Sequence, residues 1–511
     1  MRNFPRNNKL IFLIFFIGLI IRFLYFPQNI YFAYDQARDS FTSLEILKGD
    51  FKIVGPPSAA SDKLFPGPLI FYVYAPLYWL GGNSPEIVAA FLRIFNALGI
   101  FLVFLIGSLM FNRYIGLITA LFFAVSYEQS QYSLFISHQP LAVIPVLIFY
   151  LGLNLLFFKK DKRGLILTTL GWGTSIQFHY VYILLGVGLF LLALLFRHKL
   201  PRINHKIIII SVFTFLTTVS TYILSEIKFD FRLTLELFSG FLTKFTTSNT
   251  SGPDIYPSSI IFTTNRFLHD SFLANFSLTF IPGILLIVSA SLLLFKKETR
   301  KKLAFLCIWL LGGLLPYFLS GTPSYYYSAA ASVSLFLLAA YLIHKLYKRY
   351  SIVALTITIG IIVNNIYLIS TINHKGPNSD IVIQPGMLLS SEKQALDYIY
   401  TNTKGEPFAV RSLTIPFNIN TTWSYIFEWY GNKKYGKLPL WIGPVAKGYP
   451  GNIPVIDNRS SLPSTQFLII EPTVGIRNQT IEKFFEEENY FTRIEEEKSF
   501  GTVTVQKRQK I

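Results

Sequence analysis

A short charged run, YFAYDQARDS at residues 31–40, follows the first long apolar segment of the chain. It brings Asp35, Arg38 and Asp39 within five positions of one another. A carboxylate there could take a proton from a hydroxyl group or orient it, and a guanidinium could hold an anionic oxygen. Two simpler interpretations stay open. Asp35 and Arg38 could only pair with each other and order a loop, and Asp39 could be the N-cap of a helix beginning at Ser40.

The composition shows what kind of structure must position this run. The chain has 511 residues, of which 52% are hydrophobic and 14% charged, and its mean hydropathy is +0.45. Soluble domains carry about a quarter of charged residues, so these values indicate an integral membrane protein. The single cysteine, Cys307, argues against a disulfide scaffold and against thiolate metal sites.

The net charge of +18 reports membrane orientation rather than a nucleic-acid partner. Nearly all of it gathers in five short basic clusters at residues 2–9, 159–163, 197–206, 296–302 and 345–349. The candidate outer loops 27–85 and 226–275 each hold four basic and five acidic residues. This asymmetry follows the positive-inside rule and predicts a cytoplasmic N-terminus.

Apolar runs near twenty residues long recur along residues 1–372, which is the length that crosses the hydrocarbon core of a bilayer. The first is interpreted as a retained signal-anchor helix. Eleven spans are predicted, at about 10–26, 86–111, 114–127, 138–158, 164–179, 180–196, 207–225, 277–295, 303–319, 327–344 and 351–372. An alternative of equal parity lets 66–81 span and makes 114–127 interfacial. We prefer the first because prolines interrupt 66–81 and none occurs in 114–127.

Residues 373–511 have the composition of a soluble α/β domain, placed outside by the odd number of spans. Helices are expected at Ser391–Asn402 and Gln479–Glu488, and strands at Pro407–Arg411, Gln466–Ile470 and Thr502–Gln506. In the first outer loop, 27–85, Asp39–Lys48 is expected to form a helix lying in the membrane interface. The predicted fold class is therefore a polytopic α-helical membrane protein with a C-terminal α/β domain.

Several sequence segments together resemble one family of membrane enzymes. They are YDQARDSFTSLEILKGDFKIVGPPS, FPGPLIFYVYAPLYWLGGNSPEIVAAFLRIFN, QFHY at 177–180 and GTPSYYY at 321–327. This combination resembles the GT-C membrane glycosyltransferases, and more narrowly the bacterial group related to protein O-mannosyltransferases and lipid A aminoarabinose transferases. The resemblance implies a sugar donor on a polyprenyl phosphate, inverting transfer at the extracytoplasmic face of the cell membrane, and Asp35 as the catalytic carboxylate.

Such a transfer also needs cations near the leaving phosphate, whose negative charge grows in the transition state. Arg38, Lys63 and Arg93 are the candidates, because all three are placed at the outer side. A buried arginine in a span marks either function or a buried pair, and Arg93 could instead pair with Glu86.

The remaining candidates come from later outer ends of spans. The resemblance implies a second carboxylate near residue 139, where this chain has Gln139. Glu128 or His138 could substitute, although Glu128 could equally be a solvated residue at a helix end and His138 could bond the loop backbone. Gln177 and His179 are also expected to face the site. Of the three tyrosines at 325–327, we choose Tyr326, against the alternative of an interfacial aromatic belt.

No cofactor is expected. No clustered metal-ligand motif, Walker loop or dinucleotide fingerprint is found, although Asp35 and Asp39, one helical turn apart, could share a divalent ion with phosphate oxygens. The expected partners are a polyprenyl-phosphate sugar donor, a lipid, glycan or protein acceptor, and the bilayer, without nucleic acid. Two other functional classes are weighed: a lipid or glycan transporter or flippase, and a non-catalytic membrane scaffold.

Overall fold

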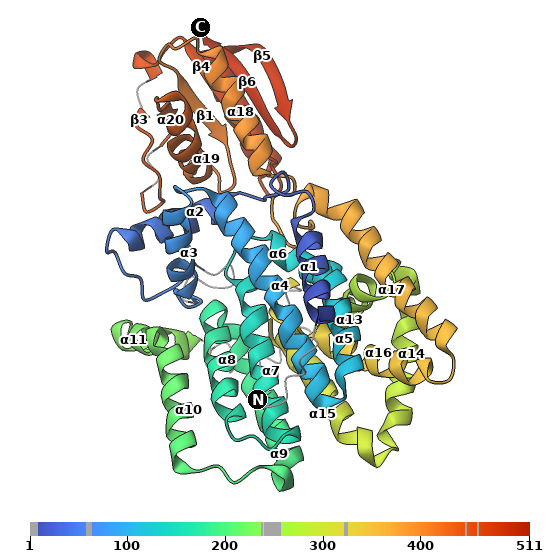
Figure 1. Ribbon diagram of the computed structural model, residues 1–511. Coiled ribbons are helices and arrows are strands. Elements are labelled where there is room, and N and C mark those ends of the chain that lie inside the picture. Colours follow the sequence, from blue (N-terminus) through green and yellow to red (C-terminus); the bar gives the residue numbers. More distant parts are fainter. Residues whose placement is uncertain are drawn as a thin grey trace, which may run out of the picture.

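The protein is described by a computed structural model in which a bundle of helices carries an α/β region on one end (Figure 1). The structure describes residues 9–57, 64–236, 239, 257–320, 325–444, 447–456 and 459–511. Lys63, one of the predicted phosphate ligands, lies outside these residues.

A helix occupies each segment that the sequence predicts to span a membrane. These helices are α1 (Lys9–Phe23), α4 (Pro85–Met110), α5 (Arg113–Val125), α7 (Val143–Phe158), α8 (Gly164–Phe178), α9 (Leu185–Phe196), α10 (His205–Thr218), α14 (Phe280–Leu294), α15 (Lys297–Ser320), α16 (Ser332–Tyr347) and α17 (Ser351–Ile372). Within the described part of the chain, four helical segments are long and apolar enough to cross a membrane alone, and α10 with α11 (Ser220–Lys228) makes a fifth if the pair counts as one span bent by 56°. The count of eleven crossings therefore stays a prediction.

Shorter helices gather at the end of the bundle that faces the α/β region (Figure 1). They are α2 (Tyr34–Leu47), α3 (Leu69–Leu80), α6 (Tyr127–Leu134) and α13 (Pro257–Ser271), with the 3-10 turns η1 (Gln139–Ala142), η2 (Tyr180–Leu184) and η5 (Tyr325–Ser328). α3 packs mainly against α2, whereas α5 packs along α4, α1 and α16. This arrangement favours 114–127 over 66–81 as the span.

Glycines allow the closest helix approaches in the bundle. A Cβ atom at Gly107 of α4 would lie 2.8 Å from the Cα of Gly116 in α5, and one at Gly152 of α7 would lie 2.5 Å from the backbone nitrogen of Thr168 in α8. Small residues let apolar helices pack backbone to backbone where no hydrophobic effect drives them together.

Two fully buried arginines connect α1, α4 and α5. Arg22 donates to Asn96 Oδ1 at 2.8 Å, to the carbonyls of Gly18 and Ala124 at 2.9 Å each and to that of Phe123 at 3.2 Å. Carbonyl and amide oxygens thus satisfy this guanidinium without a carboxylate.

Arg93 is satisfied in the same way. It donates to the carbonyl of Arg22 at 3.0 Å, to that of Ala89 at 2.9 Å and to Asn29 Oδ1 at 2.9 Å. Its predicted alternative partner, Glu86, pairs instead with Lys393 of the α/β region. The donors of Arg93 are thus used within the protein, which corrects its assignment to the phosphate.

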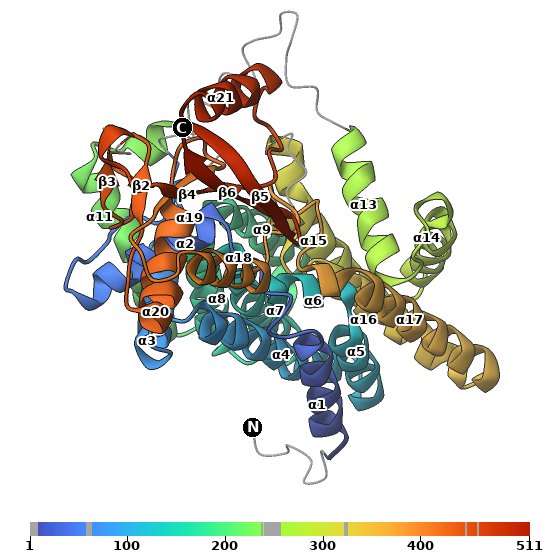
Figure 2. The same ribbon diagram turned by 90° about the horizontal axis from the view of Figure 1, so that it is seen from above.

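The C-terminal region contains a six-stranded mixed sheet, in agreement with the α/β prediction. Its order is β3-β2-β1-β4-β6-β5, with the first four strands parallel and the last two antiparallel to their neighbours. The strands are β1 (Ala409–Leu413), β2 (Leu440–Ile442), β3 (Val455–Ile456), β4 (Thr465–Ile470), β5 (Thr492–Phe500) and β6 (Val503–Lys510). The helices are α18 (Leu389–Asn402), α19 (Thr421–Ile426), α20 (Asn432–Tyr435) and α21 (Asn478–Phe491), with a π-helical turn, η7, at Phe427–Gly431. Figure 2 shows α21 beside the sheet and away from the bundle.

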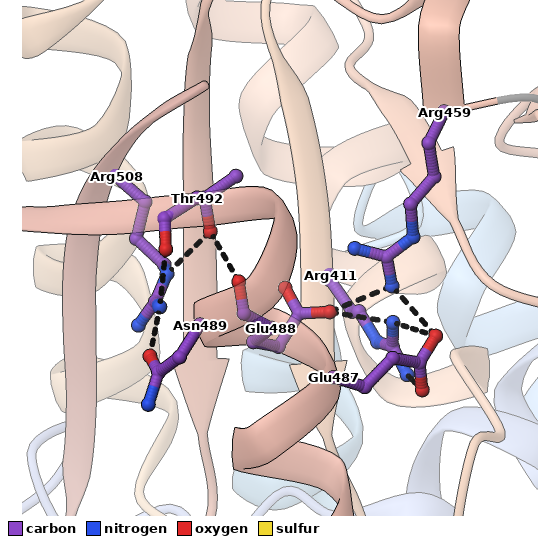
Figure 3. A network of polar contacts seen from close by, with 7 residues as sticks. All are labelled: Arg411, Arg459, Glu487, Glu488, Asn489, Thr492 and Arg508. Carbon is purple, nitrogen blue, oxygen red and sulfur yellow. Dashed lines mark hydrogen bonds and ion pairs between the residues drawn. The ribbon is translucent and has the colours of Figure 1, made fainter. Parts of the chain in front are cut away.

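A network of ions fixes α21 to the sheet (Figure 3). Arg411 of β1 and Arg459 both bind Glu488, at 2.5 and 2.7 Å, and both also bind Glu487. Because Glu488 is buried and shared by two guanidinium groups, the network supports the sheet rather than forming an open site.

Backbone pairing joins the α/β region to the first outer loop. Phe32 N donates to Met387 O at 3.0 Å, and Leu389 N donates to Ile30 O at 2.9 Å. Tyr425 of α19 adds a hydrogen bond from its hydroxyl to the carbonyl of Asn83 at 2.7 Å. The segment directly before Asp35 is therefore held by residues more than 350 positions later in the chain.

Two buried carboxylates lie at this junction. Glu471 accepts hydrogen bonds from Gln384 Nε2 at 2.7 Å, Trp423 Nε1 at 2.9 Å and Ile415 N at 3.1 Å. Glu392 is fully buried, and neither of its oxygens has a hydrogen bond from a described residue. Burial, and secondarily the charge of Glu471, raises the pKa of Glu392 well above its usual range. Burial thus favours the neutral form of Glu392 in the folded protein.

Replacing Glu392 by Gln should stabilise the protein increasingly as the pH rises. An unfolded glutamate ionises above about pH 4.3, while burial raises the pKa of the folded Glu392, so the wild type loses up to about 1.4 kcal/mol per pH unit that the amide does not lose. Thermal unfolding between pH 5 and 8 measures this difference. The exposed Glu406→Gln is the control. If the difference in unfolding temperature between Glu392→Gln and wild type stayed constant over this pH range, the raised pKa of Glu392 would be contradicted.

Replacing Arg93 by Met should lower the free energy of unfolding by about 2 kcal/mol, because Asn29 Oδ1 and the carbonyl of Arg22 lose their donor. Thermal unfolding in detergent is the measurement, with the exposed Arg197→Met as the matched control. If Arg93→Met unfolded like the wild type but bound a lipid phosphate more weakly, Arg93 would return to the set of phosphate ligands.

Candidate functional site

The charged run forms the first turns of α2, which begins at Tyr34. Gln36 fixes this end of the helix: its Oε1 accepts a hydrogen bond from Ala33 N at 3.2 Å, and its Nε2 donates to Ile136 O at 2.8 Å. The helix starts earlier than the sequence predicts, and Asp39 lies inside it. The interpretation of Asp39 as an N-cap is therefore wrong.

Arg38 lies between the two carboxylates of the run. Its Nη1 is 2.6 Å from Asp35 Oδ1, and its Nε is 2.9 Å from Asp39 Oδ1. The side chain of Asp35 is 51% exposed, whereas that of Asp39 is 4% exposed. Asp35 Oδ2 has no hydrogen bond from a described residue and is open to an acceptor molecule.

The environments of these charged groups differ. Burial raises the pKa of Asp39 to about 6, although the Arg38 guanidinium acts in the opposite direction. Burial alone would lower the pKa of Arg38, but Asp39 and Asp35 together raise it, so its charge is secure. Asp35, the exposed carboxylate with a permanent cation beside it, is the better placed of the two to meet a substrate.

Two histidines lie next to this cluster. The rings of His138 and His179 are nearly parallel, with centroids 5.8 Å apart. His179 Nδ1 accepts a hydrogen bond from Val181 N at 3.2 Å, and Gln36 of α2 bonds the carbonyl of Ile136, two residues before His138. The structure thus brings both predicted histidines to the α2 side of the bundle.

The two predicted glutamines have different surroundings. The hydroxyl of Ser137 donates to Gln139 Oε1, beside His138. Gln177 Nε2 donates to the carbonyl of Thr218 at 2.7 Å and to Thr221 Oγ1 at 2.9 Å. The amide of Gln177 therefore joins α8 to α10 and α11, and the structure gives it no contact with the charged run.

Tyr326 lies on the opposite side of the same region. Its ring stacks on Phe135 with centroids 5.0 Å apart, and Phe135 in turn contacts Tyr31, three residues before Tyr34, at 6.0 Å. Tyr326 is buried, and its hydroxyl has no hydrogen-bond partner among the described residues.

The sequence analysis did not single out Arg266, which faces the same space from α13. Its side chain is 2% exposed, and none of its three guanidinium nitrogens has a hydrogen bond with a described residue. The guanidinium lies 4.3 Å from the ring centre of Tyr325. In the sequence, Arg266 is distinguished only by its position four residues before Asp270 in a predicted outer loop.

Carboxylates surround Arg266 without bonding it. Asp270 accepts a hydrogen bond from the Tyr325 hydroxyl at 3.1 Å, and Glu128 accepts one from Ser332. Glu128 is fully buried, so its interpretation as a solvated helix end is wrong. Burial raises the pKa of Glu128 to about 7, opposed by Ser332 and Arg266. Asp270 and Glu128 thus offset the positive charge of Arg266 electrostatically, while its guanidinium nitrogens donate no hydrogen bond to a described residue.

The predicted segments therefore converge, apart from Arg93, Gln177 and the undescribed Lys63. A chain of contacts links α2, residues 128–138, His179 and η5: Gln36 bonds the carbonyl of Ile136, the rings of His138 and His179 stack, and His179 contacts Tyr327 at 5.1 Å. Within the described residues, no three His, Cys, Asp or Glu side chains come together around a possible metal position. Asp35 and Asp39 both bind Arg38.

Comparisons with known proteins relate part of this chain to a known family. Residues 66–224 match the sequence model of the family described as dolichyl-phosphate-mannose-protein mannosyltransferase. No curated protein matches the chain.

Solved structures share the fold at low sequence identity. ArnT from Cupriavidus metallidurans bound to undecaprenyl phosphate is 12% identical, with a TM-score of 0.63 over 97% of both chains. Apo ArnT gives 0.60 over the same shares, also at 12% identity. The apo oligosaccharyltransferase of Archaeoglobus fulgidus gives 0.50 at 13% identity, over 82% of this chain and 64% of that one. The resemblance inferred from the sequence is confirmed at the level of the fold: the chain has the fold of ArnT along nearly its whole length, and residues 66–224 match the mannosyltransferase family.

Proposed function

We propose that this protein transfers a sugar from a polyprenyl phosphate to an acceptor hydroxyl at the extracytoplasmic face of the membrane. The observation that carries the proposal is Arg266, a buried guanidinium that donates no hydrogen bond to a described residue. It lies 4.3 Å from the ring centre of Tyr325, and the hydroxyl of the next residue, Tyr326, is also buried and unbonded. The likeness to GT-C transferases supports a transferase over the transporter and scaffold alternatives.

The phosphate of the donor is assigned to this space. Buried polar groups in proteins are nearly always bonded, and an unbonded buried cation is especially costly. An anion with several acceptor oxygens would satisfy the three nitrogens of Arg266 and the Tyr326 hydroxyl together. The similar ArnT structure is bound to undecaprenyl phosphate, which supports a polyprenyl phosphate as the ligand of this protein.

The reaction follows from the two sides of the region. The acceptor hydroxyl donates to Asp35 Oδ2, and its oxygen attacks the anomeric carbon of the sugar. The bond from that carbon to the phosphate oxygen breaks, the electron pair leaves with the phosphate, and the acceptor proton passes to Asp35. Arg266 and Tyr326 stabilise the negative charge that develops on the phosphate. Attack opposite to the leaving group inverts the anomeric configuration.

Arg38 and Asp39 support Asp35 in this scheme. Arg38 holds Asp35 Oδ1 and so fixes the orientation of the carboxylate, leaving Oδ2 for the acceptor hydroxyl. Asp39 anchors the other side of the Arg38 guanidinium from its buried position. This chain has Gln139 where a second carboxylate was expected. Glu128 supplies a carboxylate instead, but on the phosphate side, where it acts on the charge of Arg266 rather than beside Asp35.

The proposed topology puts this region outside the cytoplasmic membrane. A cytoplasmic N-terminus and eleven crossings place α2 and the α/β region on the extracytoplasmic side. The positive clusters of the remaining loops support this orientation.

Changing Asp35 to Asn should lower kcat by about 10²- to 10⁴-fold, because a positioned carboxylate contributes a factor of that order to proton transfer. The assay is sugar transfer from a polyprenyl-phosphate donor by purified protein. Asp50→Asn, an exposed carboxylate in the same loop, is the control. Turnover like that of the wild type in a correctly folded Asp35→Asn variant would refute the catalytic role.

Changing Arg266 to Ala should weaken binding of the polyprenyl phosphate by about 100-fold, since a charged hydrogen-bond partner of a buried anion contributes about 2–4 kcal/mol. Tyr326→Phe removes one hydrogen-bond donor, so its loss of affinity should be smaller than that of Arg266→Ala. Isothermal titration with undecaprenyl phosphate measures both, with Arg163→Ala as the exposed control. Unchanged affinity in Arg266→Ala would show that the phosphate binds elsewhere.

A further inference from the structure

The described part of the connection from β2 to β3, residues 447–454, reaches from the α/β region to the first turn of α2, where Tyr449 contacts Tyr34. It follows the carboxyl end of a parallel strand, the edge at which sheets of this kind bind ligands. Asn452 anchors it, because its backbone nitrogen and its Nδ2 donate to the two oxygens of Glu428 at 2.8 and 2.9 Å. Glu428 belongs to the π-helical turn η7, and such turns often occur at functional sites.

Tyr449 extends from this connection beside α2. Its ring contacts that of Tyr34, with centroids 6.1 Å apart, and 44% of the residue is exposed. Gly448 precedes Tyr449 with a φ of +84°, a conformation that side chains rarely adopt. Tyr34 directly precedes Asp35 and has the Arg38 guanidinium 5.6 Å from its ring centre. One aromatic ring from α2 and one from the α/β region thus lie together at the first turn of α2, which carries Asp35.

This combination fits one class of molecule. A pyranose ring has an apolar face of C–H groups and a rim of hydroxyls. The face packs against an exposed aromatic ring, and the rim hydrogen-bonds to carboxylate and guanidinium groups. A serine or threonine side chain of a peptide offers a hydroxyl but no such face.

We propose that Tyr449 and Tyr34 form a subsite for a sugar ring of the acceptor, so that the acceptor is a glycan or glycolipid rather than a protein. The inference rests on the proposed function of Asp35, towards which the subsite directs one acceptor hydroxyl. Tyr449 is a binding residue of the acceptor and takes no part in binding the donor phosphate near Arg266.

Direct binding tests the subsite without turnover. The full-length protein, in a detergent without sugar groups, is titrated with fluorescently labelled mannobiose, chitobiose and lactose and with labelled serine- and threonine-containing peptides. At least one disaccharide should bind the wild type. Tyr449→Phe and Tyr449→Trp should keep this affinity because stacking remains, whereas Tyr449→Ala should lose at least about tenfold. Tyr490→Ala, which removes another exposed tyrosine of the α/β region, should bind like the wild type.

Two further measurements separate the possible failures. Thermal unfolding should be equal for Tyr449→Ala and wild type, so that lost binding reports the subsite and not the fold. The Asp35→Asn variant should still bind the disaccharide, so a failed catalytic assignment leaves the subsite intact. Binding of the peptides alone, binding of no disaccharide, or equal binding by Tyr449→Ala would overturn the proposal.

Discussion

The structure depends on how each buried guanidinium satisfies its donors. Arg22 and Arg93 hold three helices together because every nitrogen that faces the bundle meets a carbonyl or amide oxygen of the chain. Arg266 is as buried as Arg93 but has no such oxygen among the described residues. The same side chain thus supports the fold in one place and is open to a ligand in the other. The difference lies in the surrounding acceptors, not in the charge.

Hydropathy was sufficient to locate the helices that occupy the eleven predicted spans, because the need for long apolar segments acts on each segment separately. The strands and helices of the C-terminal region were found where their patterns were strong, as in α18, β4 and α21. The short strands β2 and β3, with too few residues to show a pattern, were missed. So was β5, whose run of charged residues at 495–498 hides its alternation.

The candidate site was less readable from the sequence than the fold. Asp35, Arg38, His138, His179 and Tyr326 converge because their segments end at the same side of the bundle, which topology alone implies. Whether Arg93, Glu128 and Arg266 are hydrogen-bonded depends on residues far away in the chain, such as Asn29 and Ser332. Neither spacing nor residue type carries that information. The start of α2 was misjudged because Gln36, rather than Asp39, caps it.

The pairing of the first outer loop with the α/β region also constrains biosynthesis. Ser390 bonds the carbonyl of Gln28, 362 residues earlier in the chain. At the usual rates of translation, the ribosome needs about 20–70 s to make the intervening chain. During that interval the segment before Asp35 lacks its backbone partners, Met387 and Leu389. The protein is therefore completed last at the place where its chain begins, and a product truncated before Met387 would leave the backbone groups of Ile30 and Phe32 unpaired.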